Sequence, residues 1–195
     1  QNAVDGGKRK YIMIQLPEPC DAKSTAAKAG YKTICEIGKE RIRKAGQNIK
    51  AEAPLLATEL DVGFRVLKLD EPNMNDVYYS PAEYSQDLLS MLESNVKSDR
   101  NDLDLLFGCL LEWGLPLSLP YSSEQIDGCT VHNYNDGDLI ACFDKNVPDS
   151  VIEEIAKRQP LRAVFRDSGF ANSPSKINVG EIFKLMAPDT RVKVI

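Results

Sequence analysis

The one histidine and the five cysteines have the most distinctive side-chain chemistry in this sequence of 195 residues. His132 lies in an alternating segment that places no cysteine or serine nucleophile beside it, and a lone histidine is seldom a catalytic base. We therefore expect His132 to be a half-exposed strand residue. The cysteines are Cys20, Cys35, Cys109, Cys129 and Cys142. They form no C-x-x-C or H-x-x-x-H spacing, so the sequence predicts no metal site.

Charged residues form two further candidate sites. Glu18 follows an apolar run, and an acidic residue at the end of a strand in a nucleotide-binding fold accepts hydrogen bonds from ribose hydroxyls. A carboxylate in this position also caps turns. Two basic groups could neutralise phosphates, although solvated outer faces, which are the norm on amphipathic helices, explain them better. These candidate DNA-binding residues are Lys8, Arg9, Lys10, Arg41, Arg43 and Lys44.

The first third of the chain has the pattern of a strand, a helix and a second strand. Residues 11–16 are apolar on both faces, as in a strand that helices cover on either side. Residues 33–49 have apolar side chains at helical spacing with a basic outer face. Residues 63–70 alternate apolar with basic side chains. We expect a βαβ unit with parallel strands, whose ligands would gather beyond the carboxyl ends of the strands.

The remainder of the chain predicts a second α/β layer after a polar, turn-rich stretch at residues 71–81. Turn signals predict a small β-meander, and the apolar stretch 103–119 predicts an exposed patch that pairs subunits. The expected helices cover residues 81–96, from Asp99 or Asn101 to Trp113, 148–158 and 173–186. The expected strands cover residues 130–134, 139–143, 162–166 and 191–195.

Bulk composition excludes several protein classes. With 43% hydrophobic and 27% charged residues the chain is typical of globular proteins. Its 24 basic and 29 acidic residues give a net charge of −5, the wrong sign for a protein that binds nucleic acid over its whole surface. No apolar run is long enough to span a membrane. Unclustered cysteines in odd number indicate a reducing, cytoplasmic setting. Because the chain begins at Gln1 without a methionine, we expect it to be a piece of a longer protein.

Several segments resemble type III modification methyltransferases, which transfer a methyl group from S-adenosylmethionine to N6 of adenine in DNA. The most specific block is D-G-G-K-R-K-Y-I-M-I-Q-L-P-E-P at residues 5–19. Further matches cover residues 29–34, 38–45, 63–70 and 164–170. The resemblance implies a site-specific DNA methyltransferase of a restriction-modification system, with S-adenosylmethionine as cofactor. Its implied partners are double-stranded DNA, a second modification subunit in a homodimer, and a restriction subunit.

The resemblance also implies that the reaction centre lies outside this chain. In that family a catalytic D-P-P-Y segment and an F-x-G-x-G cofactor loop precede the block at residues 5–19, and neither occurs here. We expect residues 1–75 to be a remnant of a Rossmann-like sheet, residues 76–195 to be an α/β interaction domain, and the fragment to be inactive alone. Either Gln15 or Glu18 would meet the cofactor ribose. The alternative is a non-catalytic module for dimerisation or restriction-subunit docking.

Overall fold

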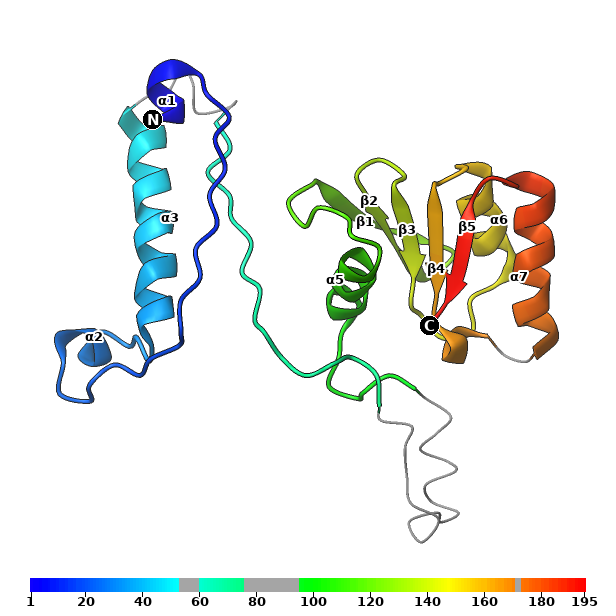
Figure 1. Cartoon of the computed structure of the whole chain (residues 1–195), viewed down its shortest axis with the longest axis horizontal. Coiled ribbons are helices and arrows are strands. Elements are labelled where there is room, and N and C mark those ends of the chain that lie inside the picture. The colour runs from blue at the N-terminus through cyan, green and yellow to red at the C-terminus, as the bar shows by residue number, and fades with distance from the viewer. Residues whose placement is uncertain (53–59, 76–94, 171–172) are drawn as a thin grey trace, which may run out of the picture. The chain divides into compact units, whose positions relative to one another are not determined.

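The computed structural model describes residues 1–52, 60–75, 95–170 and 173–195 (Figure 1). The chain divides into two compact units, Gln1–Leu67 and Lys68–Ile195. Helices and a five-stranded mixed sheet confirm the predicted α/β class. Assignment of residues 1–75 and 76–195 to a methyltransferase remnant and an interaction domain stays a prediction. No helix in the described part of the chain is both long and apolar enough to cross a lipid bilayer.

The first unit is organised around one long helix. Its helices are α1 (Asn2–Asp5), α2 (Thr25–Lys28) and α3 (Ile34–Glu52), and α3 confirms the predicted amphipathic helix. Gly46 is the one buried residue among residues 1–52 and 60–67. Val62 packs closely there, since a Cβ on Gly46 would lie only 3.0 Å from Cβ of Val62. The described part of this unit therefore has helical structure without a closed hydrophobic core.

The two strands predicted in the first unit are not formed, so the predicted βαβ unit is wrong at the level of hydrogen bonding. Residues 11–16 and 63–70 are extended without strand pairing. Figure 1 shows the blue and teal segments running in the same direction, opposite to α3, which is the chain path of a βαβ unit. A strand requires a hydrogen-bonded neighbour, and neither segment pairs with a strand among the described residues. Ile12 and Ile14 are consequently 92% and 94% exposed.

The second unit contains one sheet with strand order β1-β2-β3-β4-β5. The first three strands pair antiparallel and the last three pair parallel. The strands are β1 (Tyr121–Ile126), β2 (Cys129–Tyr134), β3 (Leu139–Cys142), β4 (Arg162–Phe165) and β5 (Arg191–Val194). This sheet confirms all four strands predicted after residue 120 and adds β1, whose side chains are almost all exposed.

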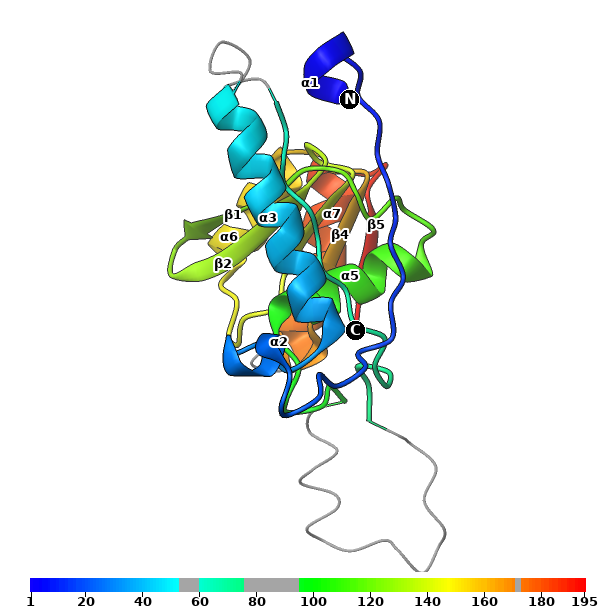
Figure 2. The ribbon, with the colours of Figure 1, turned by 90° about the vertical axis from the view of Figure 1, so that its left-hand side faces the viewer.

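Helices cover both faces of this sheet, as Figures 1 and 2 show. The helices are α5 (Asp102–Glu112), α6 (Asp149–Lys157) and α7 (Ser173–Met186), with a short 3₁₀ turn η1 (Asp167–Gly169). Side chains alternate along β3, so Ile140 and Cys142 face the α6 and α7 side while Leu139 and Ala141 face α5. Each face has its own buried cluster, and the described residues of this unit therefore form a three-layer core.

The expected helices that end at Trp113 or cover 148–158 and 173–186 are confirmed. Residues 81–94 of the helix predicted over 81–96 lie outside the described residues, and Val96, at its predicted end, forms an isolated bridge with Met74 instead. The exposed apolar patch predicted for residues 103–119 is wrong. Leu105, Leu106 and Leu110 are buried against the sheet, and Leu111 is the most exposed leucine of α5. An apolar stretch that looks like an interface in the sequence is thus one face of the core.

Candidate functional site

The residues predicted to meet a cofactor lie at the first turn of α3. The carbonyl of Glu18 accepts a hydrogen bond of 3.0 Å from the N–H of Ile34. The Cys35 thiol donates to the carbonyl oxygens of Gln15 at 3.6 Å and Leu16 at 3.5 Å. Both the Gln15 and Glu18 side chains are exposed. Their role in cofactor binding stays a prediction.

An acidic side chain already occupies this helix start. The Glu36 carboxylate accepts a hydrogen bond of 2.6 Å from the N–H of Lys32. This hydrogen bond lowers the pKa of Glu36 from its ordinary value, so the group is ionised at neutral pH. A negative charge near a helix N-terminus is favourable. A second anion here would have to displace Glu36 or tolerate its repulsion, whereas a neutral hydroxyl-bearing ligand would not.

Arg9, in the basic triplet at the start of the chain, has an intramolecular partner. Both terminal nitrogens of Arg9 donate to Asp5, at 2.9 and 2.8 Å. These bonds hold the pKa of Asp5 well below its usual range. Lys8 and Lys10 are exposed. The pairing of Arg9 reduces its charge available to a phosphate, and DNA binding by these three residues stays a prediction.

The basic face of α3 borders a groove of about 440 Å³ within the first unit. Arg43 lies 3.8 Å from Glu40 and 5.7 Å from the centre of the Phe64 ring, while Lys44 lies 3.6 Å from Glu40. Arg41 is exposed on the same helix. The groove is lined by Arg43, Gln47, Lys50, Val62, Gly63, Phe64 and Val66. Cations that bind phosphates and an aromatic ring that stacks on bases are typical of nucleic-acid sites.

Three lining residues were missed by the sequence analysis: Gln47, Lys50 and Phe64. The signal was present, since Arg43, Gln47 and Lys50 are spaced i, i+4 and i+7 and so share a helix face. Phe64 comes from the extended segment after α3, and no helical spacing could associate it with them. DNA binding by Arg41, Arg43 and Lys44 stays a prediction.

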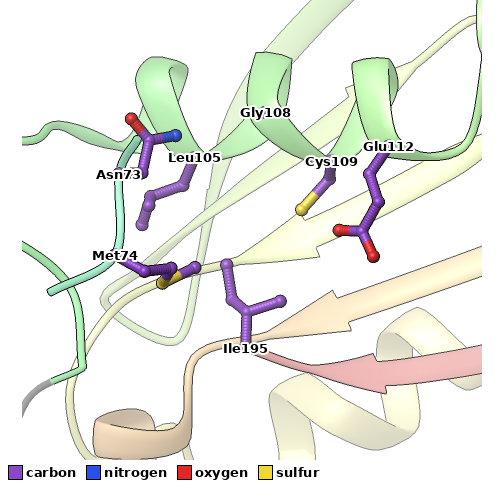
Figure 3. Close-up of a pocket in the computed structure, with 7 residues that line it drawn as sticks. All are labelled: Asn73, Met74, Leu105, Gly108, Cys109, Glu112 and Ile195. Carbon is purple, nitrogen blue, oxygen red and sulfur yellow. The ribbon is translucent and has the colours of Figure 1, made fainter. Parts of the chain in front are cut away.

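A smaller cavity of about 160 Å³ lies beside α5 in the second unit (Figure 3). It is lined by Asn73, Met74, Leu105, Gly108, Cys109, Glu112 and Ile195. The Asn73 amide donates to the carbonyl of Asp104 at 2.8 Å, so this side chain is held in place. Burial raises the pKa of the Cys109 thiol to about 11, which keeps it protonated. A protonated thiol is a poor nucleophile.

His132 lies on strand β2 as expected, but the expected half-exposure is wrong, because the residue is only 5% exposed and has two polar partners. Its Nδ1 lies 2.8 Å from Oγ of Ser123, and its Nε2 lies 3.3 Å from Oδ2 of Asp102. Strand pairing places Ser123 opposite His132, and the start of α5 supplies Asp102. None of the three lines either cavity described above. We interpret the network as a structural link between β1, β2 and α5.

Comparison with known proteins gives one partial similarity, and no protein-family model matches the chain. The chain is 38% identical over 71 residues to the Type III restriction-modification enzyme StyLTI Mod subunit of Salmonella typhimurium strain LT2. The aligned part is 36% of this chain and 11% of that protein. This finding relates about a third of the chain to a modification subunit, and the rest has no such counterpart in that alignment.

Proposed function

We propose that the chain is the C-terminal part of an S-adenosylmethionine-dependent, site-specific DNA adenine-N6 methyltransferase of a type III restriction-modification system. The observation that carries this proposal is the unfinished sheet of the first unit. Residues 11–16 are extended, apolar on both faces and largely exposed, with α3 following them in the order of a βαβ unit. The partial similarity to a Mod subunit supports the same function.

The apolar segment requires neighbouring strands and a second covering layer. Burial of a large aliphatic side chain stabilises a protein by about 1.5 to 3 kcal/mol, and Ile12, Ile14 and Leu16 are 92%, 94% and 71% exposed. A segment apolar on both faces is typical of an interior strand in a parallel sheet. The remaining strands of a methyltransferase sheet, carried by the rest of the parent protein, would bury all three.

The two parts divide the reaction between them. The missing part would supply D-P-P-Y, which holds a flipped adenine, and F-x-G-x-G, which approaches the cofactor. This chain would contribute Gln15 or Glu18 to the cofactor ribose, and the groove beside Arg43 to the DNA backbone. The fragment alone lacks both motifs and would be inactive. S-adenosylmethionine supplies the methyl group in the parent enzyme.

A second function would fit the second unit taken by itself. Its core is closed on both faces of the sheet, so it needs no further polypeptide to fold. Its strand β1 is an edge strand with exposed side chains, and an unpaired edge can add a strand from another chain. A non-catalytic module for dimerisation or for docking a restriction subunit would use this edge. Sedimentation that shows a dimer without cofactor or DNA would favour it.

Complementation tests the methyltransferase proposal directly. The chain alone should give no S-adenosylmethionine binding in a calorimetric titration. When a polypeptide carrying D-P-P-Y and F-x-G-x-G is added, methyl transfer from labelled cofactor to adenine should appear. The double variant Ile12→Asp, Ile14→Asp should abolish this activity, because charges cannot enter a sheet interior without a large desolvation cost.

Ile177→Asp is the matched control, since Ile177 is 68% exposed on α7 in the other unit. It should complement as well as the unaltered chain. Tight cofactor binding by the chain alone would contradict the proposal, as would full complementation by the Ile12→Asp, Ile14→Asp variant.

A further inference from the structure

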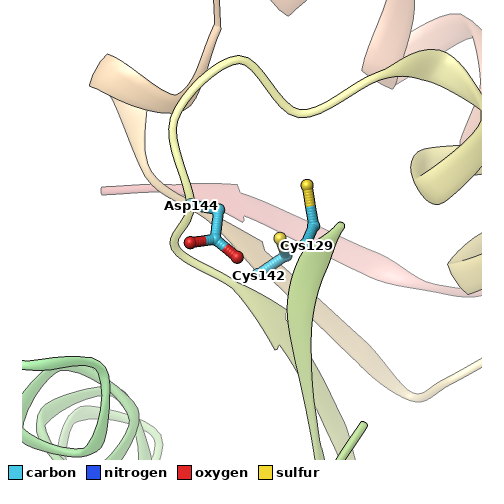
Figure 4. A group of neighbouring side chains, drawn as sticks. All are labelled: Cys129, Cys142 and Asp144. Atoms are coloured by element: carbon cyan, nitrogen blue, oxygen red, sulfur yellow. The ribbon is translucent and has the colours of Figure 1, made fainter. Parts of the chain in front are cut away.

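Two buried thiols and one carboxylate meet at one end of the β2–β3 hairpin (Figure 4). One ligand atom from each of Cys129, Cys142 and Asp144 lies within 4.8 Å of the others. Cys129 and Cys142 are 6% and 0% exposed, and Asp144 is half-buried. The proposed methyltransferase function does not use this cluster. The sequence analysis did not predict it, because its donors have no familiar metal-binding spacing.

Strand register explains how these residues meet. Val131 pairs with Cys142 in the antiparallel β2–β3 ladder, so Cys129, two residues earlier, shares the face of Cys142. Continuing this register by two residues sets Asp144 opposite Cys129. The backbone N–H of Thr130 donates to Oδ2 of Asp144, which orients the carboxylate. Such a hydrogen bond behind a ligand is typical of metal sites.

The geometry is better suited to a shared metal ion than to a disulfide bond. Diagonal neighbours in an antiparallel ladder have Cα atoms about 7 to 8 Å apart, whereas a disulfide bridges Cα atoms up to about 7 Å apart. Both cysteines are free. A tetrahedral Zn²⁺ with Zn–S bonds of about 2.3 Å sets its sulfur ligands about 3.8 Å apart. Donors within 4.8 Å need only small side-chain rotations to reach that spacing.

The donor set suits a metal ion that binds sulfur. Cys129 and Cys142 supply two sulfur atoms and Asp144 supplies a carboxylate oxygen. A thiol binds a metal ion as its thiolate, so metal binding at this site would release protons.

We propose that Cys129, Cys142 and Asp144 form a Zn²⁺ site in which two sulfur ligands and one oxygen ligand leave a fourth position for water. Two sulfur donors with a carboxylate select a borderline-soft ion such as zinc over magnesium or calcium. The ion would tie the first residue of β2 to the segment that leaves β3.

Cobalt titration of the whole, reduced chain tests this site. The other cysteines are first replaced, in the variant Cys20→Ala, Cys35→Ala, Cys109→Ala. This variant should bind one Co²⁺ per chain with thiolate-to-cobalt charge-transfer absorption, and Zn²⁺ should displace the cobalt. Zinc binding should release protons, which calorimetry in buffers of different ionisation enthalpy measures. Asp144→Asn should weaken metal binding by at least about tenfold.

Asp144→Asn keeps an oxygen for the Thr130 N–H, so the variant tests the ligand charge with little change in packing. Cys142→Ala should abolish the cobalt absorption. If the Cys142→Ala variant does not fold, the metal affinity of the Asp144→Asn variant tests the proposal instead. Single replacement of Cys109, a buried cysteine on the opposite face of the sheet, should change nothing. The proposal is overturned if the folded triple variant binds no cobalt, or if Asp144→Asn leaves the affinity unchanged.

Discussion

At the residue scale, His132 is a buried polar side chain of the second unit with a partner at each ring nitrogen. It is 5% exposed, and its ring contacts Ser123 on one side and Asp102 on the other. A buried polar group costs free energy when it loses its partner. The histidine therefore makes the pairing of β1 with β2, and the placement of the start of α5, depend on one another.

Ser123→Ala should destabilise the chain by about 0.5 to 1.5 kcal/mol, because Nδ1 of His132 loses its partner in a largely buried position. The free energy of unfolding from urea denaturation measures this change. Ser122→Ala is the matched control, since Ser122 is an exposed neighbour on the same strand, paired with Asn133 in register. Equal losses from the two variants would show that the His132 contact contributes nothing.

A second residue-scale prediction concerns the ion pair between Glu124 on β1 and Arg158 at the end of α6. The hydrogen bond from Arg158 lowers the pKa of Glu124 below its ordinary value of 4.5. The stabilisation is therefore present above the unfolded-state pKa and disappears as the pH falls through the lower folded-state pKa. Both side chains are partly exposed, so solvent screening limits it to about 0.5 kcal/mol.

Glu124→Gln should accordingly be less stable than the unaltered chain at neutral pH and equally stable in acid below the folded-state pKa. Urea denaturation at both pH values checks this. A difference that persists in acid would mean that the Glu124 side chain acts through packing and not through its charge.

At the scale of elements, α5 shows how local sequence sets a helix start. The Asn101 side chain accepts a hydrogen bond of 3.1 Å from the N–H of Asp104, and the Asp104 carboxylate accepts one of 2.9 Å from the N–H of Asn101. This reciprocal capping box satisfies two amides that would otherwise lack partners. The helix then buries Leu105, Leu106 and Leu110 against the sheet. The capping box therefore starts the helix at a position from which these three leucines face the core.

Asn101→Ala should cost about 1 kcal/mol of stability, within the range of about 0.5 to 2 kcal/mol for N-cap replacements. Asp104→Ala should cost less, and the double variant should cost less than the sum because each cap supports the other. Chemical denaturation of the four proteins completes this cycle. Strict additivity would show that the two hydrogen bonds act independently.

Elements that are set by residues close together in the sequence, such as caps and turns, could be predicted. Strand pairing and side-chain contacts between residues far apart in the sequence could not. The capping residue Asn101 and the turns around Gly128 and Gly137, both with positive φ, fix α5 and the hairpin. The extended residues 11–16 have a strong strand pattern, but pairing requires a neighbour that the described chain does not provide. The partners of His132 lie 9 and 30 residues away, and no spacing rule associates them.

At the scale of the whole molecule, the two units differ in how completely they bury their apolar side chains. The second unit has a buried cluster on each face of its sheet. In the described part of the first unit Gly46 alone is buried. Burial of apolar surface is the main stabilising contribution to folding. Most of the buried apolar side chains of the described residues therefore lie in the second unit.

Hydrogen exchange should resolve this difference along the sequence. Amides of β3 and β4, such as those of Ile140 and Val164, should exchange only on global unfolding of their unit. Amides of residues 11–16 should exchange at rates close to those of an unfolded chain. Mass spectrometry of peptic fragments measures both. Strong protection of residues 11–16 in the chain alone would contradict the account of an unfinished sheet.

The exposed segment at residues 11–16 also determines how copies of this chain behave toward one another. Six consecutive residues without charge, glycine or proline are the pattern of segments that stack into cross-β fibrils. Lys8, Arg9 and Lys10 precede it and Pro17 follows it. Flanking charges and prolines oppose such stacking. The basic triplet that we predict to contact DNA thus has a second effect. It opposes the stacking of the exposed segment 11–16 on the same segment of other copies of the chain.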